Sequence, residues 1–245
     1  MFSDKSPPHT KVYADRGTPY PCTQEELDIL QNPDMKRVEL PHYIDRIEAT
    51  RLLQEAHDGP LSDAQKAAVK RLNDLREAKR WGPDIIFKIF NDLDLLLFRG
   101  KLRGNVYLRW DNTSGPESKT LGSTLYSKIT NNRCRITMGF ANATKATVGL
   151  RDVLSTLIHE MVHAYLMILT RDDEGPSDKA TDGHGNSFIK CSKAVMKRLG
   201  PGFKDIIESP GYDSRRQWDP QWSSGFKFDG KKEERPQGRR WGWRR

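Results

Sequence analysis

The sequence has little cysteine and no long apolar run, and both absences exclude classes of protein. Its three cysteines, Cys22, Cys134 and Cys191, are scattered and form no Cys-x-x-Cys pair. Neither a disulfide framework nor a cysteine-based zinc ribbon is therefore expected. The longest apolar run covers residues 164–169, far short of the roughly 20 residues of a membrane helix. Residues 1–16 are polar and lack the apolar stretch of a secretory signal. These absences favour an intracellular protein with no membrane partner.

Positive charge is concentrated near the end of the chain. Lysine and arginine number 41 against 33 aspartates and glutamates, a formal net charge of +8. Residues 210–245 hold ten of the basic residues, five of the acidic ones and four of the six tryptophans. Basic side chains can contact phosphates, and neighbouring aromatic rings can stack on unpaired bases. This basic, tryptophan-rich tail predicts contact with DNA and favours the nucleus over the cytoplasm. The alternative is a flexible tail, or aromatic rings that dock on the protein's own surface. The residues predicted to contact nucleic acid are Arg239, Arg240, Trp241, Trp243, Arg244 and Arg245.

Apolar spacing and breaking residues divide the first hundred residues. Residues 1–40 are polar and rich in proline, which predicts a flexible segment with one short helical turn at 25–30. Residues 41–81 read as a helical extension of two helices, the second starting after Ser62 as its N-cap. A further helix follows Gly82, with Pro83 suited to its first position, and is expected to end at Gly100, because glycine favours helix termination.

The middle of the chain predicts a small sheet and a buried helix. Apolar residues alternate over 105–110 and 134–140, and 120–127 is a third expected strand, so the three form an expected antiparallel meander. Residues 151–170 are apolar almost all round, which is typical of a buried helix. A last helix is expected from residue 186 or 187 to 199, stopped by Gly200-Pro201. Trp110 and Tyr165 are expected in the core, with lining of a substrate cleft as the alternative for either. The expected fold class is α+β, with a compact domain over 82–209.

His159, Glu160 and His163 form H-E-x-x-H inside the buried helix. Residues four apart share one helix face, so both imidazoles can bind one metal ion. Glu160 is rotated about 100° from His159, so it can reach a water on the metal without binding the metal itself. Two histidines, a third ligand and an open position are what a zinc hydrolase needs, with the glutamate as general base.

The third ligand has to come from outside this helix, because no Gly-x-x-His follows His163. The candidates are His184, Asp182 and Glu174. His184 is favoured because its flanking glycines allow close backbone approach and because neutral imidazole suits zinc. Asp182 is the second choice and Glu174 the third. The other histidines are expected to be exposed and outside the site: His9, His42 and His57.

Three blocks in this order resemble the SprT-like metalloprotease family, which includes the Spartan-like proteases of DNA–protein crosslinks. They are F-N and F-x-G-K-L within 90–102, T-L-I-H-E-M-V-H-A-Y-L at 156–166 and D-G-H-G-x-x-F at 182–188. The resemblance implies a minigluzincin-like or zincin-like fold, in which a small antiparallel sheet packs on the active-site helix. It implies zinc bound by His159, His163 and His184, with Glu160 as catalytic base. The zinc ribbon that many family members carry after this domain is not expected here, since no cysteine follows Cys191.

The sequence thus predicts a zinc metalloendopeptidase domain over 82–209, between the helical extension at 41–81 and the tail at 210–245. Its expected substrates are proteins or peptides, including DNA-associated or DNA-crosslinked proteins. Two other functions remain open: a non-proteolytic, zinc-containing module that binds nucleic acid, and a peptidase with no link to nucleic acid.

Overall fold

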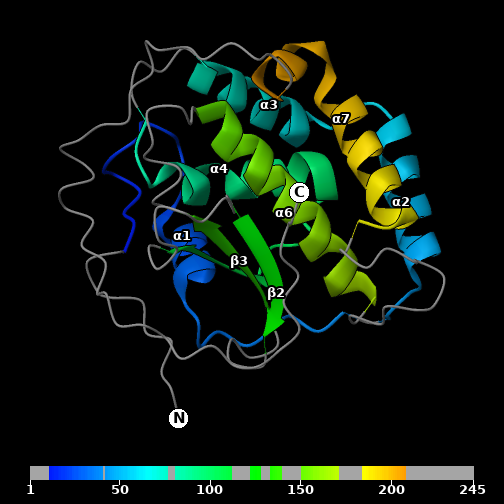
Figure 1. Ribbon diagram of the computed structural model, residues 1–245. Helices are drawn as coiled ribbons and strands as arrows, with labels where there is room; N and C mark the ends of the chain where they lie inside the picture. The colour runs from blue at the N-terminus through cyan, green and yellow to red at the C-terminus, as the bar shows by residue number, and fades with distance from the viewer. Residues whose placement is uncertain are drawn as a thin grey trace.

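The computed structural model describes residues 11–40, 42–76, 81–111, 122–127, 133–139, 150–170 and 184–207. Figure 1 shows helices gathered around a small sheet, as the predicted α+β class requires. The helical elements are α1 (Gln24–Gln31), α2 (Arg46–Asp58), α3 (Asp63–Arg76), α4 (Ile85–Leu93), the π-helical η2 (Asp94–Phe98), α6 (Leu150–Thr170) and α7 (Asn186–Ile207). The strands are β1 (Val106–Asp111), β2 (Gly122–Ser127) and β3 (Arg133–Gly139).

The sheet is mixed, so the predicted antiparallel meander is wrong. The strand order is β1-β3-β2, with β3 parallel to β1 and antiparallel to β2. Alternating side chains locate strands in a sequence, but pairing of consecutive strands is only a tendency. Here β3 takes the central position, and Cys134, Ile136 and Met138 on it are all buried. Since β3 lies between the other two strands, β1 and β2 are the two edge strands of the described sheet.

The long helix α6 lies at the centre of the molecule (Figure 1). It contacts β2, β3, α2, α4 and α7. By length and composition alone, Asp152–Thr170 could cross a membrane, yet 72% of that stretch is buried within the protein. The surrounding sheet and helices therefore account for its apolar surface, as for the core helix of a folded domain. Trp110 and Tyr165 are buried as expected, and the Tyr165 hydroxyl donates to the Ala49 carbonyl at 3.0 Å.

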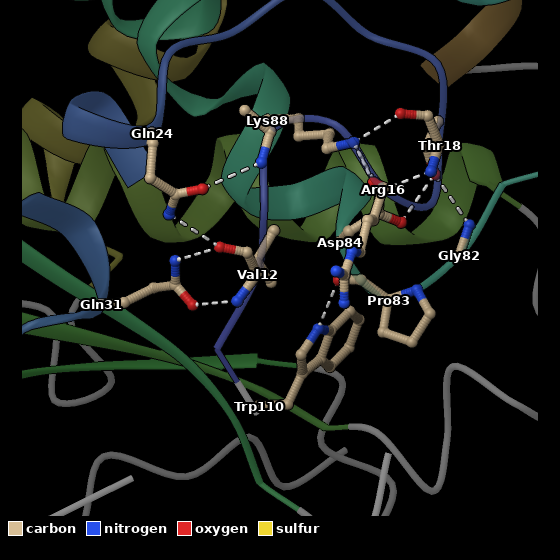
Figure 2. Close-up of polar contacts among 11 residues, drawn as sticks. Val12, Arg16, Thr18, Gln24, Gln31, Gly82, Pro83, Asp84, Lys88 and Trp110 are labelled. Atoms are coloured by element: carbon tan, nitrogen blue, oxygen red, sulfur yellow. Dashed lines mark hydrogen bonds and ion pairs between the residues drawn. The ribbon is translucent and has the colours of Figure 1, made fainter. Parts of the chain in front are cut away.

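The described part of residues 1–40 packs on this core. Val12, Leu27 and Leu30 are buried within it. Figure 2 shows two glutamine side chains of α1 holding the backbone of Val12: Gln31 Oε1 accepts from its N–H at 2.7 Å, and Gln24 Nε2 donates to its carbonyl at 3.1 Å. The predicted helical turn at 25–30 is confirmed as α1. The predicted domain boundaries at 40, 81 and 209 stay predictions.

Side chains from α2 and α3 bind the irregular backbone of η2. His57 Nε2 contacts the Leu97 carbonyl at 2.7 Å, and Gln65 Nε2 donates to the Leu95 carbonyl at 3.1 Å. His57 is buried, so the prediction that it is exposed is wrong. His57 lies near the end of α2, where its side chain faces the interface that α2 forms with α7 and η2. This interface depends on tertiary packing and is not evident from the local sequence. His42 is exposed as expected, and His9 lies outside the described residues.

The predicted helix boundaries at Ser62 and Gly100 are confirmed, whereas the helix expected from Pro83 begins at Ile85 as α4. Ser62 caps α3, because its Oγ accepts from the Gln65 N–H at 3.2 Å. The helix that begins as α4 ends after η2, where Gly100 has a φ of +74°. The expected stop at Gly200-Pro201 is wrong, since α7 continues to Ile207. A proline inside a helix removes one backbone hydrogen bond and bends the axis, and the final turns of α7 lie at an angle in Figure 1.

Candidate metal centre

Three histidines from two segments meet at one point. His159 and His163 lie one turn apart on α6, and their Nε2 atoms are 3.3 Å apart. His184 lies just before α7, with its Nε2 3.1 Å from that of His159 and 3.2 Å from that of His163. They form the one group of three or more metal-binding side chains found in the described part of the chain. The alternative third ligands, Asp182 and Glu174, lie outside the described residues.

The spacing of these nitrogen atoms fits a tetrahedral metal site. Nitrogen ligands at tetrahedral positions about 2.0–2.1 Å from zinc lie about 3.3–3.4 Å from one another, close to the observed 3.1–3.3 Å. When all three Nε2 atoms carry lone pairs, these point toward one another, and a cation between them would relieve the repulsion. The donor set and its geometry therefore suit a divalent metal that prefers imidazole, of which zinc is one.

Burial keeps these ligands in the form that binds metal. Burial lowers the pKa of His159 to about 4, with a smaller effect of His184. It also lowers the pKa of His163 to about 3, assisted by His159, His184 and Arg46. At neutral pH both imidazoles are therefore unprotonated, as metal ligands must be.

Phe188, on the first turn of α7, packs against all three histidine rings. It stacks on His163 with ring centroids 4.3 Å apart, and contacts His159 and His184 edge-on at 4.8 and 4.7 Å. The ring is only 5% exposed, so it keeps water from one side of the cluster and holds the imidazoles in place. In the sequence, Phe188 stood out only as the last residue of the D-G-H-G-x-x-F motif. Its spacing of four residues after His184 was the available signal for a supporting role.

Glu160 lies on α6 beside the cluster but is not a member of it. Its side chain is buried, and the Thr124 hydroxyl on β2 donates to its Oε2 at 2.7 Å. Burial raises the pKa of Glu160 to about 7, while the hydrogen bond from Thr124 acts in the opposite direction. A carboxyl group with a pKa near neutrality can both accept and release a proton, which is the property of a general acid–base group.

Strand β2 approaches α6 closely at Gly122. A Cβ atom at this position would lie 2.7 Å from Cγ2 of Thr156 and 2.9 Å from Cγ of Glu160. Only glycine therefore fits without displacing one of these side chains. Neither Gly122 nor Thr124 stood out in the sequence, because their role depends on which strand lies over the helix.

The six predicted nucleic-acid contacts lie outside the described residues: Arg239, Arg240, Trp241, Trp243, Arg244 and Arg245.

Comparison with known proteins gives one match. Residues 86–207, about half of the chain, match the model of the SprT-like family. This segment begins within α4 and ends with α7, so it contains the sheet, Glu160 and all three histidines. No curated protein and no solved structure matches the chain.

Proposed function

Residues 86–207 of this chain belong to the SprT-like family, a family of metallopeptidases, and we propose that the protein is a zinc-dependent endopeptidase. One observation carries the proposal. The Nε2 atoms of His159, His163 and His184 converge beside a buried carboxylate, Glu160, that is not part of the same ligand group. A structural zinc site closes its coordination with four protein ligands, whereas a catalytic site has three and a neighbouring base.

The roles of the residues follow from their placement. His159, His163 and His184 would hold zinc, which supplies a Lewis acid that polarises a carbonyl and lowers the pKa of water. Glu160 takes the proton of the attacking water and passes it to the nitrogen of the leaving amine, so that the peptide bond breaks with no net proton change. Phe188 excludes water from one side of the imidazoles and keeps their orientation constant.

An extended peptide is the substrate shape that suits this arrangement. Of the two edge strands of the described sheet, β2 is the one that lies against α6 at Glu160. A substrate strand that pairs with this edge would bring its backbone toward the cluster. Backbone pairing reads no side chains, so cleavage would tolerate many sequences.

We further propose that the substrates are proteins associated with DNA, in the nucleus. Support comes from the basic, tryptophan-rich tail, whose composition suits contact with phosphates and unpaired bases. A non-proteolytic, zinc-containing nucleic-acid-binding module is less consistent with the site. A purely structural metal needs no neighbouring base, and burying Glu160 without such a role would be costly.

The decisive comparison is between wild type and Glu160→Gln. Gln keeps the size of the side chain and an acceptor for Thr124, but cannot take a proton. Both chains are expected to bind one zinc ion per molecule, and only wild type to cleave an unfolded protein substrate. Equal cleavage by the two chains would overturn the mechanism.

The link to DNA requires a separate test. Two quantities are measured for the full chain and for a chain ending at residue 209. They are DNA affinity at several salt concentrations, and cleavage of a DNA-bound protein with and without single-stranded DNA. The full chain is expected to bind DNA with an affinity that falls steeply with salt, and the shortened chain to lose most of that affinity. Unchanged affinity after shortening would refute the role of the tail while leaving the peptidase proposal intact.

A further inference from the structure

We propose that Thr124 on β2 is a positioning residue for Glu160, an inference that rests on the proposed peptidase function. Thr124 holds one oxygen of the Glu160 carboxylate and so keeps the base at a constant place beside the three histidines. β2 would then have two roles: it is the strand expected to pair with the substrate, and it orients Glu160, the base that activates water.

The contact joins two buried side chains. Thr124 is 7% exposed and Glu160 is 4% exposed. Thr124 Oγ1 lies 2.7 Å from Glu160 Oε2 and 3.0 Å from the main-chain carbonyl oxygen of the same residue. A hydroxyl has a single proton, and a hydrogen bond to an ionised acceptor is shorter and stronger than one to a neutral acceptor. The shorter distance to Oε2 agrees with that preference.

Thr124 contacts one of the two carboxylate oxygens. Among the described residues it donates to Oε2 of Glu160, and no donor reaches Oε1. A base needs one oxygen held and the other free to accept a proton. A single donor on β2 therefore orients the group without using up its basic oxygen.

Gly122 and Thr124 act together because residues two apart point to the same face of a strand. Gly122 leaves room for Glu160, since a Cβ there would lie 2.9 Å from Cγ and 3.0 Å from Oε1 of that side chain. Thr124 then supplies the hydroxyl further along. On this face of β2, Gly122 leaves space for the Glu160 side chain and Thr124 supplies a hydrogen-bond donor for its carboxylate. The intervening Ser123 points to the opposite face of the strand.

Position matters for a glutamate because its side chain has several rotatable bonds. Loss of the hydroxyl would let the carboxylate sample other rotamers within its buried site. A misplacement of about 1 Å at a reacting group can reduce the rate by roughly 100-fold. The loss should appear in kcat and leave KM nearly unchanged, because the Thr124 side chain binds the base and the substrate pairs with the backbone.

The test compares Thr124→Val, which keeps the shape and loses the hydroxyl, with Thr124→Ser, which keeps the hydroxyl. In the zinc-loaded full chain, Thr124→Val is expected to lower kcat about 10- to 100-fold, with KM and zinc content close to wild type. Thr124→Ser is expected to restore most of kcat. Ser123→Ala, on the opposite face of β2, is the matched control and is expected to behave as wild type.

A second measurement does not depend on activity. In the metal-free full chain, unfolding is measured for Thr124→Val, Glu160→Met and the double variant. If the two side chains interact, the effect of the double variant on the unfolding equilibrium constant differs from the product of the two single effects by a factor between about 2 and 100. A double effect equal to that product would overturn the proposed contact.

The outcomes separate the two proposals. An active wild type, together with an equally active Thr124→Val chain, overturns the positioning role alone. Equal losses in Thr124→Val and Thr124→Ser also overturn it, because the hydroxyl would then be irrelevant. If the wild-type chain binds zinc but cleaves no substrate, the proposed function is refuted, and the positioning role is refuted with it.

Discussion

Lys88 and Asp84 form an ion pair one helical turn apart, with Nζ and Oδ2 separated by 3.1 Å and both side chains almost completely buried. Figure 2 shows that the pair holds the N-terminal segment against α4. Thr18 Oγ1 donates to Asp84 Oδ1 at 2.7 Å, and Lys88 Nζ donates to the carbonyl oxygens of Arg16 and Thr18. Each charge is therefore paired and hydrogen-bonded, the condition under which a buried ion pair is tolerated.

Replacing one partner of this pair should destabilise the protein strongly. Lys88→Met keeps the length of the side chain but leaves Asp84 buried without its counter-charge and frees two carbonyl groups. We expect a loss of about 3–5 kcal/mol in the free energy of unfolding, measured by urea denaturation. Lys66→Met is the control, because Lys66 pairs with Asp63 at an exposed site, where ion pairs contribute little. A similarly small effect of both substitutions would contradict the structure.

Metal removal should destabilise the wild-type chain and have no effect on a chain with an incomplete cluster. A ligand present at a thousand times its Kd stabilises the folded state by about 4 kcal/mol, or roughly 8–16 °C in Tm for a chain of this size. A chelator should therefore lower the Tm of wild type by that amount. His184→Ala should have a low Tm that the chelator does not change. His42→Ala, at an exposed position, should respond as wild type does; a chelator-sensitive His184→Ala chain would show that His184 is not a ligand.

Gly122→Ala should disturb the contact between β2 and α6. The added methyl group would lie 2.7 Å from Thr156 and 2.9 Å from Glu160, closer than van der Waals contact allows. We expect a loss of about 1–3 kcal/mol in stability, together with reduced cleavage and retained zinc. Gly59→Ala is the matched control, because nothing lies within 4 Å of its added Cβ. Its φ of −84° also suits alanine, so the control should be neutral or slightly stabilising.

His57 should make stability depend on pH. Burial lowers its pKa in the folded protein, with further lowering by Arg198 and Arg99 and an opposing effect of the Leu97 and Ala194 carbonyls. Below the unfolded-state pKa of about 6.5, the unfolded chain binds a proton that the folded chain does not. Stability is therefore complete above about pH 6.5 and is lost as pH falls toward the lower folded-state pKa.

His57→Gln tests this dependence, since glutamine can still donate to the Leu97 carbonyl but does not titrate. Urea midpoints at pH 7.5 and 5.5 should fall less in the variant than in wild type. The comparison cancels the contribution of the three clustered histidines, which both chains share. His42→Gln, at an exposed position, should leave the wild-type difference unchanged. An identical pH dependence in wild type and His57→Gln would show that His57 is not the titrating group.

A chain that starts at residue 82 should not fold cooperatively, although it contains the whole segment that matches the family. It would lack Leu27, Leu30, Leu53 and Leu72, which are buried in the shared core. It would also lack Arg71, whose guanidinium binds Asp92 through two hydrogen bonds of 2.6 and 2.7 Å. We expect no sigmoidal thermal transition in circular dichroism. A cooperative transition with full zinc binding would show that residues 1–81 are a separable extension.

Local pattern was sufficient for much of the fold. The four-residue spacing of His159 and His163 places both on one face of any helix, and apolar residues around them predicted that α6 is buried. Ser62 and Gly100 marked helix ends correctly because capping and left-handed backbone are properties of a few neighbouring residues. Alternation located β1 and β3 for the same reason.

Tertiary structure decided the rest, because it depends on contacts between residues far apart in the chain. Strand alternation is the same for parallel and antiparallel pairing, so it could not place β3 between β1 and β2. The burial of His57 and the packing of residues 11–40 on the core likewise depend on distant neighbours. The sequence alone was sufficient to identify the residue types of the proposed hydrolytic metal site. Only the fold brought His184 within 3.2 Å of its two partners and placed Gly122 and Thr124 against Glu160. Thr124 and Glu160 are 36 residues apart in the chain, so their contact forms only when the core assembles.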